Sequence, residues 1–226
     1  VIGVAGYVLL WQAAPSPRSA FWRGLAWGTG HFAVGSYWIL EAFNVPPADY
    51  RLLGPPIVAG LSVVLGFFPG LAAWAARHAV DRFPSLGGRY ARLVVLAIAW
   101  TGAEWLRGHV FTGYPWNPLG HVWAFAVPLL QGAALFGIYG LGLLTFLVLA
   151  APVAGWRAAL AALAVVGLGG WAGAAILPGL DTAAAPGRPV IRIVQPNVAQ
   201  AEKWRPETRA AQLARLVEMS RQPGFD

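Results

Sequence analysis

The stretch Glu104–Trp116 (EWLRGHVFTGYPW) brings together side chains that could do chemistry at the end of an apolar segment. Glu104 and Arg107 are three residues apart, so a helix would place them on the same face. An ionisable residue inside an apolar, membrane-type segment is a candidate functional group. Because a residue of opposite charge stands so near Glu104, the pattern favours a structural ion pair over a catalytic acid.

Beyond Arg107 the helix has to end, because helix-breaking residues follow closely. These are Gly113, Pro115 and Pro118. Irregular backbone at membrane depth is tolerated only where protein or a water-filled cavity covers it. Three aromatic residues accompany the break: Phe111, Tyr114 and Trp116. They could form the lip of a site for an amphiphilic substrate or belong to an interfacial aromatic belt. The sequence leaves both interpretations open.

Other patterns that carry chemistry are absent from the sequence. The four histidines show no metal-binding spacing, there is no cysteine, and neither a G-x-S-x-G elbow nor a Walker loop occurs. We therefore expect no metal, no cofactor and no complete catalytic set in this chain. His31 lies in an apolar segment, where we expect it to face other helices and to form a hydrogen bond.

The composition identifies the class of protein that must hold these residues. Hydrophobic residues make up 58% of the 226 residues, charged residues only 11%, and the mean hydropathy is +0.58. A soluble domain carries about 25% charged residues. Pro55–Ala76 and Ala158–Pro178 contain no charge at all, and each is close to the roughly 20 residues that cross a bilayer as a helix. The sequence predicts a polytopic α-helical membrane bundle.

Six apolar segments are readable along residues 1–178: Val1–Ala13, Ala20–Leu40, Pro55–Ala76, Leu93–Leu106, Ala126–Ala151 and Ala158–Pro178. The loop Arg77–Arg92 carries four arginines against one acid, which is typical of a cytoplasmic loop. Alternation from that loop predicts an extracytoplasmic exit after Pro178. The net charge of +7 is thus explained by topology, and we expect no nucleic-acid partner.

Two further patterns concern helix packing and membrane depth. Glycines recur at the four-residue spacing that lets membrane helices approach closely: Gly24 with Gly28, Gly66 with Gly70, and Gly169 with Gly173. Aromatic residues near the segment ends predict interfacial anchors: Trp22, Tyr37, Trp38, Tyr50, Trp123 and Trp156.

The composition changes after Pro178. Residues 179–188 read as a linker, Pro189–Val194 as a buried strand, and Pro206–Arg221 as an amphipathic helix. We expect residues 189–226 to begin a soluble α/β domain. The chain starts inside an apolar run and stops soon after this helix, so we interpret both ends as truncations.

Two blocks, EWLRGHVFTGYPWNPLG and IRIVQPNVAQAEKW, together resemble apolipoprotein N-acyltransferase. In the first block the matching residues are Arg107, Phe111, Thr112, Gly113, Pro115 and Trp116. In the second they are Gln195, Asn197, Lys203 and Trp204. The resemblance implies that residues 189–226 open a nitrilase-like (α-β-β-α sandwich) domain on the periplasmic side of the bacterial inner membrane.

The implied function is acyl transfer in lipoprotein maturation. A phospholipid acyl donor acylates an enzyme cysteine, and the thioester then acylates the α-amino group of a diacylglyceryl-lipoprotein acceptor. In the family the Glu–Lys–Cys set lies downstream of the motif that ends at Trp204. No catalytic residue is therefore assigned here, and we expect this piece alone to be inactive.

The resemblance implies substrate-binding roles for Trp204 and Trp116, and the aromatic pattern adds Tyr114 and Phe111. For Trp204, packing inside the fold is an equally good reading. A polytopic transporter, or a membrane anchor for a small extracytoplasmic domain, remains an alternative. A lipid-sized groove open sideways to the bilayer would favour the acyltransferase, whereas a central aqueous path would favour transport.

Overall fold

The computed structural model describes residues 2–44, 50–177, 192–199, 202–203 and 205–222, and in these residues it is helical, with no strand. The α-helices are α1 (Ile2–Gln12), α2 (Pro17–Gly35), α3 (Gly54–Arg82), α4 (Arg89–His109), α5 (Val127–Leu130), α6 (Ala133–Ala154), α7 (Trp156–Ile176) and α8 (Pro206–Arg221). Short 3-10 helices connect several of them: η1 (Tyr37–Asn44), η2 (Pro84–Leu86), η3 (Val110–Thr112) and η4 (Leu119–Trp123).

Two of the six predicted apolar segments are broken rather than continuous. Ala20–Leu40 divides at Ser36, where α2 ends and η1 begins. The Ser36 side chain is buried there, and its hydroxyl lies 3.0 Å from the Tyr114 hydroxyl. Ala126–Ala151 divides into α5 and α6, and α6 itself kinks at Gly137 with φ +65°. Only glycine adopts that backbone readily.

The contact between α2 and α3 depends on the predicted small residues. A β-carbon at Gly28 would lie 2.8 Å from Pro69 Cγ, and one at Gly66 would lie 2.7 Å from Thr29 Oγ1. Any larger residue would force the helices apart. The glycine prediction is confirmed for these two pairs, and Gly173 packs against the backbone of Pro128 in α5.

The core joins α1, α3, α4 and α6 around large aromatic side chains. Tyr7 and Trp11 of α1 are each 1% exposed and contribute to one apolar cluster with Trp100 and Phe146. The Tyr7 hydroxyl donates to the Pro69 carbonyl at 2.8 Å, and Trp11 Nε1 donates to the Ala73 carbonyl at 2.9 Å. Both polar tips are thus satisfied inside an apolar core.

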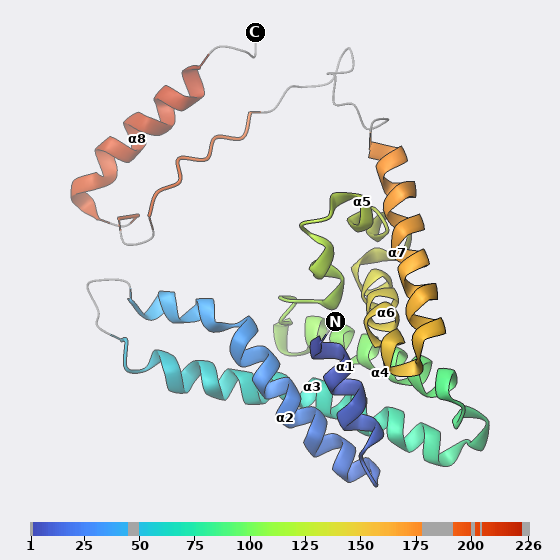
Figure 1. Ribbon diagram of the computed structural model, residues 1–226. Helices are drawn as coiled ribbons and strands as arrows, with labels where there is room; N and C mark the ends of the chain where they lie inside the picture. Colours follow the sequence, from blue (N-terminus) through green and yellow to red (C-terminus); the bar gives the residue numbers. More distant parts are fainter. Residues whose placement is uncertain (1, 45–49, 178–191, 200–201, 204, 223–226) are drawn as a thin grey trace.

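Figure 1 shows α2 and α3 crossing closely, with α7 steeply inclined to α3 and with α5 beside the C-terminal end of α7. Among the described helices, α3, α6 and α7 are long and apolar enough to cross a membrane. Helices α2 and α4, of 19 and 21 residues, are comparable in length with α7 but are less apolar. The chain is therefore a membrane protein with a helical bundle.

The C-terminal prediction is met in part. Helix α8 has the expected bounds, Pro206–Arg221, but none of its residues is buried, and Figure 1 draws it away from the bundle. In Pro189–Val194 only residues 192–194 are described, and they form no strand. A strand is stabilised by hydrogen bonds to a neighbouring strand, and the described residues offer none.

Candidate functional site

The loop after α4 is held by one buried arginine. Arg107 is 3% exposed, and its Nη1 donates to the carbonyl oxygens of Tyr114 at 2.7 Å and Trp116 at 2.6 Å. Its guanidinium also lies over the Phe32 ring, with 5.1 Å from Cζ to the ring centroid. A planar guanidinium suits this combination of forked hydrogen bonding and stacking. Arg107 therefore fixes the backbone that carries the two aromatic side chains.

Glu104 extends the same arrangement to the next element. Its Oε1 accepts a hydrogen bond from the backbone N–H of Leu119 at 2.8 Å and lies 3.9 Å from Arg107 Nη2. The predicted ion pair is thus present, but each partner makes its shorter contacts with loop backbone. Together the two side chains hold the segment from Tyr114 to Leu119, called the clamped loop below. The sequence predicted the ion pair but not these contacts with the loop backbone.

The turn that leaves α4 is strained. Phe111 and Thr112 have φ of +54° and +80°, followed by Gly113 at +84°. A bulky or β-branched residue in this region is an outlier that persists only where surrounding contacts enforce it. Here the Tyr114 N–H donates to the Arg107 carbonyl at 2.7 Å, which closes the turn.

The three described aromatic candidates occupy different environments around this turn. Phe111 is 93% exposed and projects from the strained turn. Trp116 is 56% exposed and meets Trp38 edge to face at 6.3 Å. Tyr114 is partly buried, and its hydroxyl bonds to Ser36. Trp204 lies outside the described residues.

Asn117 is a positioning residue that the sequence reasoning missed. Its Nδ2 donates to the Gly35 carbonyl at 3.0 Å, and its own φ is +57°. Asparagine tolerates this left-handed backbone better than most residues. An asparagine between tryptophan and proline was the only signal of this role in the sequence.

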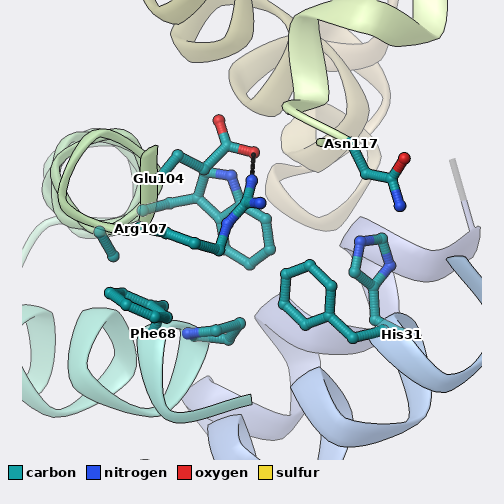
Figure 2. Close-up of a pocket in the computed structure, with 9 residues that line it drawn as sticks. His31, Phe68, Glu104, Arg107 and Asn117 are labelled. Atoms are coloured by element: carbon teal, nitrogen blue, oxygen red, sulfur yellow. Dashed lines mark ion pairs between the residues drawn. The ribbon is translucent and has the colours of Figure 1, made fainter. Parts of the chain in front are cut away.

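A small cavity of about 10 Å³, room for roughly one water molecule, lies beneath the loop, between α2, α3 and α4. Figure 2 shows Glu104 and Arg107 on one side of it and His31 and Asn117 on the other. His31 stacks on Trp27 at 5.0 Å between ring centroids and, contrary to expectation, makes no hydrogen bond to the described residues. Stacking in an aromatic core takes the place of the expected polar contact.

A second, much larger space lies between α5, α6 and α7. It has a volume of about 410 Å³. Its lining is apolar apart from Gln131 and Thr145, and Trp123 Nε1 donates to Thr145 Oγ1 at 2.7 Å. Trp123 is therefore partly buried and forms part of the groove wall. Lining residues Leu135 and Val165 are 78% and 53% exposed, so the groove opens at the protein surface.

This chemistry suits an amphiphile more than a metal or a polar solute. No group of three or more metal-ligating side chains occurs in the part of the chain that the structure describes. The groove offers apolar walls on the helices suited to a membrane, and the clamped loop offers exposed aromatic side chains.

Comparison with known proteins gives a consistent result. The N-terminal domain of apolipoprotein N-acyltransferases matches residues 1–151. The chain is 36% identical over 234 residues to an apolipoprotein N-acyltransferase of Caulobacter vibrioides, covering 99% of this chain and 42% of that protein.

Two further apolipoprotein N-acyltransferases show the same extent of similarity. The Allorhizobium ampelinum protein is 38% identical, over 86% of this chain and 36% of its own length. The Chromobacterium violaceum protein is 34% identical, over 84% of this chain and 37% of its own length. The chain thus spans less than half the length of these curated relatives. No solved structure matches it.

Proposed function

The chain belongs to the apolipoprotein N-acyltransferase family, and on that premise we propose that the full-length protein transfers an acyl chain from a phospholipid to a lipoprotein. The acceptor is the free α-amino group of an N-terminal diacylglyceryl-cysteine. This chain contributes the membrane half, where the acyl donor binds.

The observation that carries the proposal is the apolar groove between α5, α6 and α7. Its volume of about 410 Å³ lies within the roughly 300–1000 Å³ usual for small-molecule pockets. Among the described residues, no charged side chain lines it. Because two of its walls are helices apolar enough to span a bilayer, an acyl chain can enter it without leaving an apolar environment. A transporter of polar solutes would need a polar path instead.

The chemistry requires two acyl transfers. In the first, a cysteine thiolate attacks the phospholipid ester carbonyl, so that a C–S bond forms, the C–O bond breaks, and the lysophospholipid alkoxide takes a proton. In the second, the acceptor amine attacks the thioester carbonyl, so that a C–N bond forms, the C–S bond breaks, and the amine loses a proton. The cysteine, its carboxylate base and its lysine belong to the remaining part of the full-length protein.

The aromatic residues of this chain are assigned binding roles. Trp116, Tyr114 and Phe111 would contact the lipid where the membrane bundle meets the catalytic domain. Arg107 and Glu104 hold that loop and are positioning residues. Trp204, which ends the second block that resembles the family (IRIVQPNVAQAEKW), would contact the acyl chain or lipid.

We further propose a multi-pass protein of the bacterial inner membrane, with residues 189–226 opening a periplasmic nitrilase-like domain. Supporting this topology, Nη1 of Arg89, in the predicted cytoplasmic loop Arg77–Arg92, donates to the Ala154 carbonyl at 2.8 Å, which places the turn between α6 and α7 at the same end of the bundle. Helix α7 is steeply inclined to α3 in Figure 1, so these two helices do not indicate a common membrane normal. The proposed topology is therefore argued from the lengths of the segments and the charges of the loops.

The test is acylation of a diacylglyceryl peptide by the full-length protein in phospholipid vesicles. Ala172→Trp would fill the groove from α7, and Ala174→Trp adds the same bulk to that helix at a position that does not line the groove. We expect the first to reduce acyl transfer about tenfold or more and the second to leave it near wild type. In the family the catalytic residues follow one another along the chain in the order Glu, Lys, Cys, downstream of Trp204. Replacing that cysteine should abolish transfer. If transfer does not depend on that cysteine, the proposed acyltransferase mechanism is refuted. If Ala172→Trp and Ala174→Trp reduce transfer equally, the groove is refuted as the site that binds the acyl chain.

A further inference from the structure

A polar cavity lies at the opposite end of the bundle from the clamped loop. It has a volume of about 470 Å³ and brings together three separate parts of the chain. Its lining residues are Gln12, Gly87, Arg89, Arg92, Val153, Ala154 and Gly155. The function proposed above makes no use of this cavity.

The two arginines are not neutralised within the described residues. Arg89 is exposed and uses Nη1 to bond the Ala154 carbonyl at 2.8 Å, although a guanidinium has five N–H donors. Arg92 lies with Cζ 5.4 Å from the Trp11 ring centroid, and its buried Nε has no hydrogen-bond partner. The nearby acid Asp81 is paired with Arg77 at 2.9 Å. The cavity therefore has an excess of positive charge.

The backbone adds to this excess. Helix α4 begins beside Gly88 and α7 beside Gly155, and neither has a side-chain cap or an acidic residue in its first turn. Helix N-termini carry partial positive charge, so cations placed there are unfavourable unless an anion is present. A cavity with arginines next to two uncapped helix N-termini thus carries positive charge that would attract an anion.

The position of the cavity indicates the source of the anion. Tyr90 and Trp156, which are close in sequence to its lining residues, are 60% and 69% exposed, as is typical of aromatic residues at headgroup depth. Basic pockets between membrane helices on the cytoplasmic side bind anionic lipid headgroups. We propose that this cavity binds the phosphate of an anionic phospholipid of the inner leaflet, with Arg92 and Arg89 as its ligands.

Native mass spectrometry of the purified full-length protein tests the site. The probes are phosphatidylglycerol and phosphatidylcholine with identical acyl chains. We expect wild type to retain phosphatidylglycerol selectively. Arg92→Gln and Arg89→Gln should each weaken that retention about tenfold, the effect of losing one hydrogen bond to a charged group. Arg92→Lys should keep part of it, because the charge remains.

Arg82→Gln is the matched control. It removes one exposed arginine from the same loop, and Arg82 does not line the cavity. We expect it to change retention less than twofold. Equal losses in Arg82→Gln and Arg92→Gln would overturn the site in favour of a general charge effect. Equal retention of the two lipids by wild type would overturn it as well.

A second arm adds inorganic phosphate to the lipid-bound protein. Retention that persists in phosphate supports the lipid headgroup as the ligand. Displacement of the lipid by phosphate at comparable concentration would overturn the lipid assignment in favour of a free anion. Because Arg89 is exposed, Arg89→Gln should fold normally, and its elution volume and helicity verify this.

Discussion

The guanidinium of Arg107 donates a hydrogen bond to the Trp116 carbonyl oxygen at 2.6 Å, across nine residues of chain. The same Nη1 reaches the Tyr114 carbonyl at 2.7 Å, so one nitrogen at the end of α4 fixes the backbone on which both aromatic side chains stand. The loop that carries Tyr114 and Trp116 is thus anchored by a side chain that is buried in the bundle.

Arg107→Lys should therefore disorganise the loop while the helices stay folded. A lysine ammonium keeps the charge but lacks the planar fork and stacks less well on Phe32. We expect acyl transfer by the full-length protein to fall about tenfold or more, since two charge-assisted hydrogen bonds are each worth about 1.5–3 kcal/mol. The control is Arg82→Lys on the exposed loop. Activity near wild type in Arg107→Lys would contradict the clamp.

Glycine at position 28 is required by the close approach of α2 and α3. Gly28→Ala should lower the stability of the bundle by about 1–3 kcal/mol, the usual range for overpacking a well-packed core. Gly30→Ala is the matched control, because a β-carbon there meets nothing within 4 Å. That change should leave stability unchanged or raise it by up to about 1 kcal/mol through helix propensity. Thermal unfolding in one detergent compares the two, and equal shifts would refute the contact.

Replacing Phe111 should relieve backbone strain and at the same time weaken lipid binding. Phe111→Asn places a residue tolerant of positive φ at +54°, so the melting temperature should hold or rise slightly. If Phe111 contacts lipid as proposed, acyl transfer should fall at the same time. Phe125→Asn, at another exposed phenylalanine, controls for general loss of apolar surface. A drop in melting temperature for Phe111→Asn alone would argue that the phenylalanine is structural.

Helix α8 should be the least protected helix of the isolated chain, residues 1–226. It has no buried residue, and an unpacked helix of this length is marginally stable in water. Trypsin should therefore cleave at Arg209 or Arg215 well before it cleaves α4 at Arg107, which is 3% exposed. Mass spectrometry of the early fragments gives the order. Resistance of α8 equal to that of α4 would mean that the helix is packed.

Much of the architecture could be predicted from sequence because it depends on local composition. Apolar length predicted where the helices lie, although Ala20–Leu40 and Ala126–Ala151 are broken and α3 extends to Arg82. The bounds of Pro206–Arg221 were correct. Four-residue glycine spacing predicted that these segments pack closely against other helices, whereas the structure shows that α2 pairs with α3. The break after Arg107 was visible from Gly113, Pro115 and Pro118, which cannot continue a helix.

Only the tertiary structure decided which groups meet across the chain. Nothing local to Ser36 reveals that its hydroxyl contacts Tyr114, and nothing near Arg92 shows that Gly155 lines the same cavity. The Glu104–Arg107 spacing predicted an ion pair, but not that each charge would instead satisfy loop backbone. Composition and spacing determine how a segment folds and which solvent it prefers, whereas partners distant in sequence are chosen by packing, which depends on all the helices at once.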